Sequence, residues 1–291
     1  MARNVLKAKL DIIFKKLFTS DNTVLTSFIG DILDIPKEEI KKIDIINPNI
    51  LPSAVDGKQG QLDLKMYVND KVVNVEIQLK DEGNFKDRSV YYWSKMYTDE
   101  LKRGQQYEDL KQTITINILN FNLFECEEAY SSFKLLETTR HEVLTDKCSI
   151  LFFELTKVNN KIDSNDRKKL WLQLINAETE EELEMLNETG VPEIQKAVVI
   201  LHEMSLDEEV REMARLREKW ILDEASALGN AEKRGIEKGR KEGREEGREE
   251  GRKEGREEGR KEGIETGLNV AAQKMRDSGM TEEQIQKILN L

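Results

Sequence analysis

The 291-residue chain has little of what builds secreted, membrane-spanning or histidine-based metal proteins. It contains two cysteines, Cys126 and Cys148, which are too few for a disulfide framework. Its two histidines, His141 and His202, argue against a histidine-rich zinc site and against a Ser-His-Asp triad. No run of 18 apolar residues occurs, and the first residues lack the apolar stretch of a secretory signal. We therefore expect a cytoplasmic protein with no membrane partner.

The total charge of −11 is unevenly distributed along the chain. Residues 1–124 contain 18 basic and 18 acidic side chains and are neutral overall. Residues 178–212 contain 12 acids and 2 bases, a net charge of −10 that accounts for most of the imbalance. The front of the chain is therefore not too acidic to bind nucleic acid, provided that its lysines and arginines cluster locally.

The first 160 residues alternate between helical and strand patterns. Apolar residues at helical spacing predict helices, and period-two or β-branched stretches predict strands. The helices are expected at residues 10–18, 24–33 and 85–104, and the strands at 61–68, 72–79, 113–121 and 150–155. Asn69-Asp70 separates the first two strands, which predicts a hairpin. Strands with covering helices indicate an α/β or α+β layer fold.

Three further segments follow this expected domain of residues 1–160. Residues 161–232 have the pattern of an acidic helical region, in which Pro192 suits a first helical turn and Ser205 with Glu208 forms a capping-box pattern. Residues 233–267 are a Gly-Arg-(Lys/Glu)-Glu repeat with nine glycines at a spacing of four. Residues 268–291 are expected to form a short helical hairpin.

The repeat allows two interpretations. Nine glycines would cost an isolated helix on the order of 9 kcal/mol relative to alanine. However, pairs such as Glu245 with Arg248 place opposite charges three residues apart, which supports a helix. The glycine row drifts about 40° per repeat around a helix, so a partner could follow it only in a right-handed coiled coil. The segment is therefore either a self-associating helical tail or a disordered, charge-balanced linker.

The predicted hairpin carries the most informative polar residues, Asp63 on its first strand and Glu76 and Gln78 on its second. Glu76 and Gln78 are two residues apart and share a face, and a turn at Asn69-Asp70 would place Asp63 beside Glu76. Two such carboxylates become favourable neighbours around a divalent cation such as Mg²⁺. The alternative is an ordinary solvated face of a hairpin.

The array Asp63…Glu76-Ile77-Gln78 resembles the PD-(D/E)XK nuclease motif, and the chain resembles more narrowly the recombination-promoting nuclease (Rpn) family of transposase-like bacterial proteins. The resemblance covers most of residues 1–160. Further matching blocks lie on both sides of this array in the right order, namely Asp11–Phe18, Arg88–Tyr97, Gly104–Tyr107 and the strand Ile114–Phe121. It implies a restriction-endonuclease-like core in which a mixed sheet is flanked by helices, followed by an all-helical C-terminal region.

The resemblance also implies roles for individual residues. Asp63 and Glu76 would bind Mg²⁺ or Mn²⁺ together with the backbone carbonyl of Ile77. Gln78 occupies the position that most of the superfamily gives to lysine. Asp11, on the first helix, occupies an acidic position that can hold a metal-bound water.

Two departures from the superfamily motif bear on activity. Leu62 precedes Asp63, so the Pro-Asp pair is absent, and Gln78 cannot supply a positive charge. Asp11 could equally form a surface ion pair with Lys15, worth about 0.2–0.5 kcal/mol.

The helix expected at residues 85–104 carries a candidate DNA contact as well as aromatic residues. Arg88 is the candidate phosphate contact. Tyr92 and Trp93 are expected in the core, since aromatic residues on a helix of this kind are more often buried than exposed to a ligand.

The function expected from the resemblance is a metal-dependent DNA endonuclease of low sequence specificity, linked to recombination or to defence against foreign DNA. Cutting both strands would need two sites, so a homo-oligomer is expected, with the C-terminal tail as a candidate interface. The main alternative is a catalytically degenerate DNA-binding or assembly protein. A strand-transfer transposase is a third and weaker hypothesis.

Overall fold

The computed structural model describes residues 5–46 and 64–289. The chain divides into two compact units, one that ends at Ile221 and one that begins at Leu222. We call the first the catalytic unit, because it carries the site for which a catalytic role is proposed below, and the second the tail.

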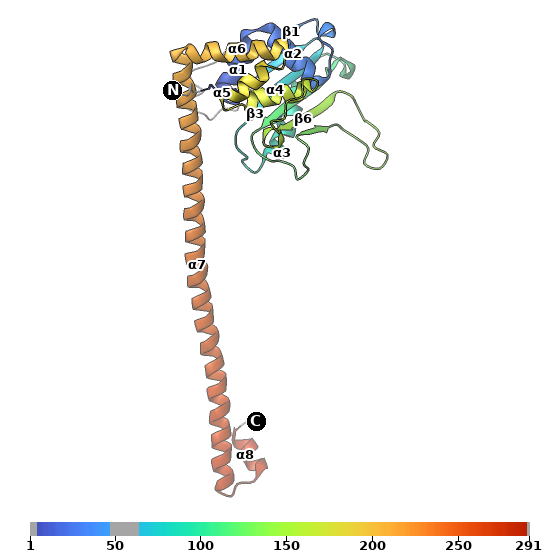
Figure 1. Cartoon of the computed structure of the whole chain (residues 1–291). Coiled ribbons are helices and arrows are strands. Elements are labelled where there is room, and N and C mark those ends of the chain that lie inside the picture. Colours follow the sequence, from blue (N-terminus) through green and yellow to red (C-terminus); the bar gives the residue numbers. More distant parts are fainter. Residues whose placement is uncertain (1–4, 47–63, 290–291) are drawn as a thin grey trace. The chain divides into compact units, whose positions relative to one another are not determined.

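The catalytic unit is built on a six-stranded mixed sheet with the strand order β1-β2-β3-β4-β6-β5. Figure 1 labels β1, β3 and β6 of this sheet. The strands are β1 (Ile43–Ile45), β2 (Leu64–Val68), β3 (Lys71–Gln78), β4 (Thr113–Leu119), β5 (Tyr130–Phe133) and β6 (Cys148–Glu154). β3, β4 and β6 are parallel, whereas β1, β2 and β5 pair antiparallel with their neighbours. The mixed sheet with flanking helices confirms the expected fold class.

Helices cover both faces of the sheet. They are α1 (Asp11–Ser20), α2 (Asn22–Leu33), α3 (Phe85–Asp99), α4 (Arg167–Asn176), α5 (Glu180–Asn187) and α6 (Pro192–Leu206), with short 3₁₀ turns η1 (Lys37–Glu39), η3 (Tyr107–Asp109) and η4 (Leu155–Lys157). The hydrophobic core does not stop at residue 160, because α4, α5 and α6 bury their apolar side chains in the same cluster as α1, α2 and one face of the sheet.

The side chains of β3 alternate between an apolar face and a polar face of the sheet. Val73, Val75 and Ile77 are buried on the face that packs against α1, α2 and α4, which lie on one side of the sheet in Figure 1. Asn74 and Glu76 are buried on the opposite face, which α3 covers through Phe85 and Trp93. A central parallel strand is usually apolar throughout, so polar residues on this face indicate a site rather than packing.

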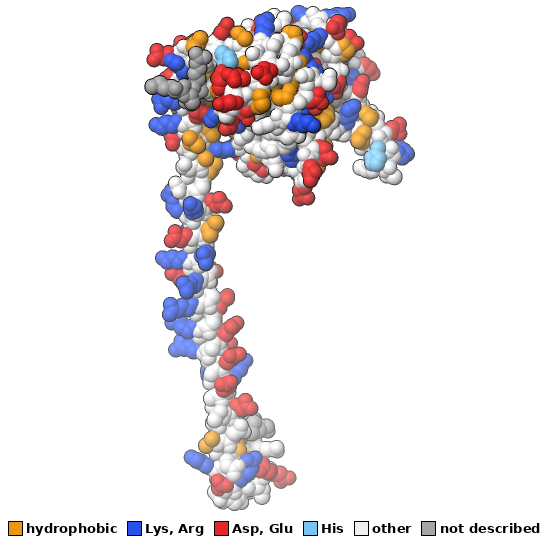
Figure 2. All heavy atoms as spheres, in the orientation of Figure 1, with side chains coloured by type: hydrophobic (Ala, Val, Ile, Leu, Met, Phe, Trp, Pro, Cys, Tyr) orange, Lys and Arg blue, Asp and Glu red, His pale blue; other side chains and the backbone are white. Residues whose placement is uncertain are grey.

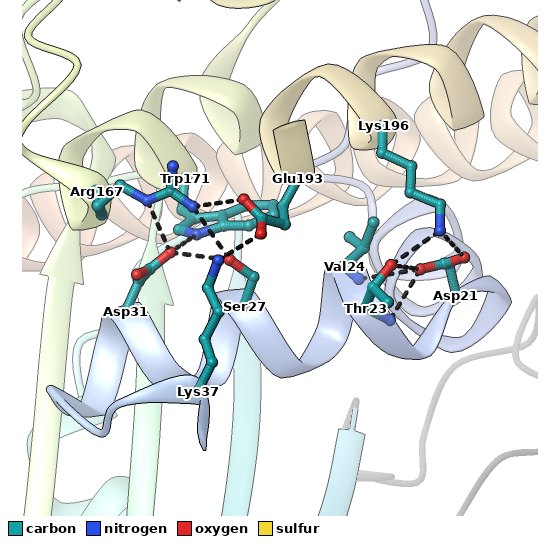
Figure 3. Close-up of polar contacts among 10 residues, drawn as sticks. All are labelled: Asp21, Thr23, Val24, Ser27, Asp31, Lys37, Arg167, Trp171, Glu193 and Lys196. Atoms are coloured by element: carbon teal, nitrogen blue, oxygen red, sulfur yellow. Dashed lines mark hydrogen bonds and ion pairs between the residues drawn. The ribbon is translucent and has the colours of Figure 1, made fainter. Parts of the chain in front are cut away.

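A polar cluster holds three helices of the catalytic unit together (Figure 3). Arg167 of α4 donates to Asp31 of α2 at 3.3 Å and to Glu193 of α6 at 2.9 Å. Trp171 Nε1 also donates to Asp31, at 2.7 Å. Burial raises the pKa of Glu193, but hydrogen bonds from Lys37 and Arg167 outweigh it, so that the pKa falls to about 2. This cluster therefore stabilises the packing of α2, α4 and α6 while Glu193 is ionised.

The tail is helical throughout most of its length. α7 (Glu208–Asp277) begins in the catalytic unit and continues for 70 residues, and α8 (Glu282–Leu289) follows a turn at Gly279. The helix is capped by Asp207, whose Oδ1 accepts from the backbone N–H of Glu209 and Val210. The capping-box pattern at Ser205 is therefore not used, since the Ser205 hydroxyl donates to the His202 carbonyl.

The glycine repeat forms part of α7, so it is helical as in the first interpretation of its sequence, whereas its self-association stays a prediction. Basic and acidic side chains project along the middle of this helix (Figure 2). A methyl group added at any repeat glycine from Gly235 to Gly267 would meet no atom within 4 Å. Within the described part of the tail, the buried apolar side chains are Ala272 and Ile285. The helix α7 is thus solvated over most of the repeat.

Candidate active site

The centre of the candidate site is Glu76 on β3. Its side chain is buried, with 8% of the residue exposed, and it lies on the same strand face as Gln78. Gln78 Nε2 donates a hydrogen bond to Glu76 Oε1 at 2.8 Å. The period of two along the strand brings these two side chains together, as the sequence predicts.

Arg88 reaches the same carboxylate from the first turn of α3. Its Nη2 lies 3.4 Å from Glu76 Oε1, and its Nη1 lies 2.9 Å from Glu82 Oε2. The guanidinium stacks over the ring of Phe85 at 5.0 Å, and Nε is buried with no hydrogen-bond partner. The structure therefore places Arg88 beside Glu76, where the sequence predicts only a contact with DNA phosphate.

Burial sets the electrostatics of Glu76. Burial raises the pKa of its carboxyl, and the nearby guanidinium of Arg88 and the amide of Gln78 offset only part of that rise. A carboxylate in this position is costly to ionise until a further cation approaches. The donor chemistry of Glu76 therefore fits a divalent metal ion, which prefers oxygen ligands.

More buried polar groups lie beside Glu76 on the same face of the sheet. In the ladder between β3 and β4, Asn74 is opposite Thr115 and Glu76 is opposite Asn117. The side-chain amide of Asn74 and the hydroxyl of Thr115 are buried without partners, whereas Asn117 donates to the Leu151 carbonyl at 2.9 Å. Orphan polar atoms at this depth are uncommon and are often satisfied by water or an ion. The sequence of β4 predicts a buried strand, and the alternation of Thr113, Thr115 and Asn117 with isoleucines is the signal that could have revealed this polar strip.

Asp63 lies outside the described residues. The hairpin that should carry it is formed, with Leu64 opposite Val75 and Val68 opposite Lys71. Among the residues that the structure describes, no group of three or more acidic, histidine or cysteine side chains is close enough to hold one metal ion. The pairing of Asp63 with Glu76, and the role of the Ile77 carbonyl, therefore stay predictions.

Asp11 is engaged by a residue far along the chain. Arg217 of α7 donates to its two carboxylate oxygens, from Nε at 3.0 Å and from Nη2 at 2.6 Å. Arg217 also lies over the ring of Trp220 at 4.5 Å. Asp11 thus has a partner that its local sequence does not reveal, and a catalytic role for it stays a prediction.

The N-terminal part of α7 also contacts the segment that follows β3. Lys80, two residues after Gln78, donates from Nζ to the carbonyl of Ile221 at 2.9 Å. Lys7 pairs with Glu218 at 2.9 Å in the same region. The start of α7 is therefore part of the catalytic unit and lies close to the strand that carries the site.

The aromatic residues of α3 divide between core and surface. Trp93 is buried and donates from Nε1 to the Thr113 carbonyl at 2.9 Å. Tyr92 is partly buried, and Tyr91 is exposed. The prediction that Trp93 belongs to the core is consistent with this packing.

Comparison with known families bears on the chemistry of this site. The family model described as PD-(D/E)XK nuclease family transposase matches residues 8–231. Comparison with curated proteins and with solved structures finds no match. The family match confirms the superfamily expected from Asp63, Glu76 and Gln78, and it extends along α7 as far as Ala231. None of the described helices is both long enough and apolar enough to cross a membrane.

Proposed function

Because the chain belongs to the PD-(D/E)XK nuclease family of transposases, we propose that it is a divalent-metal-dependent DNA endonuclease whose site is centred on Glu76. The observation that carries the proposal is a buried carboxylate on the polar face of β3, with an amide and a guanidinium on its Oε1 atom. Neither of these two bonds uses Oε2. This arrangement is suited to sharing a cation and orienting a phosphodiester.

The metal would be held by Glu76 and Asp63, with the Ile77 carbonyl as a third ligand. Leu64 is opposite Val75, so the next step of the antiparallel ladder is the one that would pair Asp63 with Glu76. Mg²⁺ is the expected ion and Mn²⁺ its replacement. When bound, such an ion activates water and neutralises charge that develops on the cleaved phosphate.

The side chains around Glu76 would orient its carboxylate and the phosphate of the DNA. Gln78 fixes Glu76 Oε1 by donating to it, so that the carboxylate keeps one orientation. Arg88 is the residue best placed to hold a backbone phosphate, because a guanidinium binds phosphate through paired N–H groups. Contacts of this kind read the DNA backbone and not its bases, which fits cleavage of low sequence specificity.

We extend the proposal to the biological setting that the family suggests, which is recombination or defence against foreign DNA, in the cytoplasm. Double-strand cleavage would need two copies of the site, and the tail is our candidate for the contact between copies. The competing function is a DNA-binding or assembly protein that has lost catalysis. Gln78 favours this second function, because it brings no positive charge to the transition state.

Cleavage of supercoiled plasmid by the full-length protein in Mg²⁺ or Mn²⁺ tests the proposal. We expect nicking that is abolished by chelator and falls by at least about 10²-fold in Asp63→Asn and Glu76→Gln, since both remove metal ligands. Asp70→Asn, in the exposed turn of the same hairpin, is the matched control and should cleave normally. DNA binding without nicking under all these conditions would establish the non-catalytic alternative.

A further inference from the structure

The position given to lysine in most of the superfamily holds a neutral amide in this chain, Gln78. We propose that Arg88 supplies the missing catalytic cation, and that Glu76 and Glu82 hold it in place until DNA and metal are bound. The inference rests on the proposed nuclease function. It assigns Arg88 a place in the reaction beyond contact with the DNA backbone.

The two ion pairs of Arg88 are unequal. The bond from Nη1 to Glu82 is 2.9 Å long, whereas the distance from Nη2 to Glu76 is 3.4 Å, near the limit for a hydrogen bond. Glu82 has 59% of its side chain exposed and Glu76 has 11%. The solvated Glu82 and the ring of Phe85 therefore anchor the guanidinium, and the contact with Glu76 is the one that can be exchanged.

Two donors of Arg88 make no hydrogen bond or only a long one, namely Nε and Nη2. Nε–H and the neighbouring Nη2 form the side-on fork that binds carboxylate or phosphate in a bidentate way. Nε has no partner and is buried, and Nη2 makes only the long contact with Glu76. A phosphate oxygen would satisfy the orphan donor, and a second oxygen would replace Glu76 on Nη2.

Arg88 and a metal ion would compete for Glu76 Oε1. Removing Arg88 then has two effects of opposite sign. Metal binding becomes tighter, because the carboxylate loses a competing cation, while cleavage becomes slower, because the phosphate loses its guanidinium. If Arg88 had only a structural role, its removal would lower metal affinity and cleavage rate together.

Two lysines are other sources of positive charge near this site. Lys80 donates to the Ile221 carbonyl and is thereby directed to α7. Lys65 lies on β2 opposite Asn74, on the same sheet face as Glu76 but two residue pairs away along the ladder. If Lys65 supplied the cation, Lys65→Gln would abolish cleavage and Arg88→Gln would not.

The test uses the full-length protein and two measurements, plasmid cleavage and Mn²⁺ binding by titration calorimetry. For Arg88→Gln we expect cleavage to fall by about 10²–10³-fold and Mn²⁺ binding to tighten by about three- to tenfold. Arg88→Lys should keep part of the activity. Lys95→Gln, an exposed charge loss on the same helix, should change neither quantity.

A rescue variant tests the assignment directly. Gln78→Lys restores a cation at the superfamily position, so Gln78→Lys with Arg88→Gln should cleave at least about tenfold faster than Arg88→Gln alone. Circular dichroism establishes that each variant is folded. Weaker Mn²⁺ binding in Arg88→Gln, or no rescue by Gln78→Lys, would overturn the inference. Failure of the wild-type protein to cleave would overturn the proposed function as well, whereas full activity of Arg88→Gln would overturn the inference alone.

Discussion

The catalytic unit and the tail are both rich in helix, but they are stabilised by different interactions. In the catalytic unit, α1, α2, α4 and α6 bury their apolar faces around Phe18, Phe28 and Trp171, which are fully buried. In the described part of the tail, the buried apolar side chains are Ala272 and Ile285, and the repeat is exposed. The catalytic unit is thus stabilised by burial, and the tail by backbone hydrogen bonds and charge pairs.

The helix α7 is packed against the core in its first turns and is solvated along the repeat. Val210 and Ala214 in its first turns are buried in the core of the catalytic unit, and Arg217 pairs with Asp11. Along the repeat, from Gly235 to Gly267, its side chains are exposed. Secondary structure alone therefore does not tell which part of a helix is stabilised by packing.

The largest effect on stability should come from the aromatic core of the catalytic unit. Phe28 is fully buried and contacts the rings of Phe14, Phe18 and Trp171. Phe28→Ala should lower the free energy of unfolding of the catalytic unit by about 3–5 kcal/mol, measured by denaturant titration. Leu228→Ala, an exposed site in the tail, should change it by less than about 0.5 kcal/mol. Equal effects at the two sites would remove the distinction between the units.

The next effect concerns the polar cluster around Glu193. Its pKa of about 2 is below the ordinary value of 4.5. Glu193 therefore adds stability above pH 4.5, and this contribution is lost as pH falls through 4.5 towards 2. Because the group is partly solvated, we expect the ionised Glu193 to contribute about 1–2 kcal/mol to the free energy of unfolding.

Glu193→Gln should remove this contribution to the free energy of unfolding at pH 7. The free energy of unfolding of the variant should then depend less on pH between 4.5 and 2. The measurement is unfolding by urea at several pH values between 2 and 7. Glu203→Gln, also on α6 and exposed, is the control and should leave the curve unchanged. A wild-type curve that does not fall between pH 4.5 and pH 2 would contradict the assignment.

A smaller effect of opposite sign is expected in the tail. Gly251 has no atom within 4 Å of an added methyl group, so Gly251→Ala should gain about 0.8–1.0 kcal/mol of local helix stability. Slower amide hydrogen exchange around residue 251 measures this gain. If copies of the chain pack along the glycine row, the same change should weaken their association in sedimentation experiments, because the helices could no longer approach closely. Faster exchange at this position would contradict an exposed single helix.

The smallest effect should come from surface charge pairs of the tail. Lys238 and Glu242 are 3.7 Å apart and largely exposed. Lys238→Gln should cost α7 about 0.3–0.5 kcal/mol at low salt and almost nothing at 1 M salt, since screening removes the interaction. Hydrogen exchange at the two salt concentrations gives the comparison. A cost above about 1 kcal/mol would mean that the pair is not simply solvated.

Much of the fold could be predicted because its core elements have strong periodicity. The hairpin of β2 and β3, the helix α3 and the strands β4 and β6 follow alternation or β-branched runs. The strands β1 and β5 are three and four residues long and partly exposed, which is too short for a period to show. The helix α3 ends at Asp99, before the expected residue 104, and the chain then turns at Gly104 with a φ of 93°.

The site could be predicted only in part, for a different reason. Glu76 and Gln78 are two residues apart, so the strand period alone brings them together. Arg88 contacts Glu76 across 12 residues, which requires knowing how α3 lies on the sheet. Arg217 contacts Asp11, which is 206 residues away in the sequence, and no local sequence pattern predicts such a contact. The lack of a partner for the Asn74 side chain could not be predicted for the same reason, because it depends on which residue of β4 lies opposite Asn74.

The four-residue unit of the tail makes its length adjustable in fixed increments. Adding or removing one unit changes a helix by about 6 Å and turns it by about 400°, which leaves a net rotation of only about 40°. Because the repeat glycines and their neighbours pack against nothing within the tail, such a change disturbs no core. The distance between Leu222 and α8 can therefore vary by whole units while the sequence around Glu76 stays the same. An insertion of one, two or three residues would instead rotate the rows of glycine, arginine and glutamate out of register.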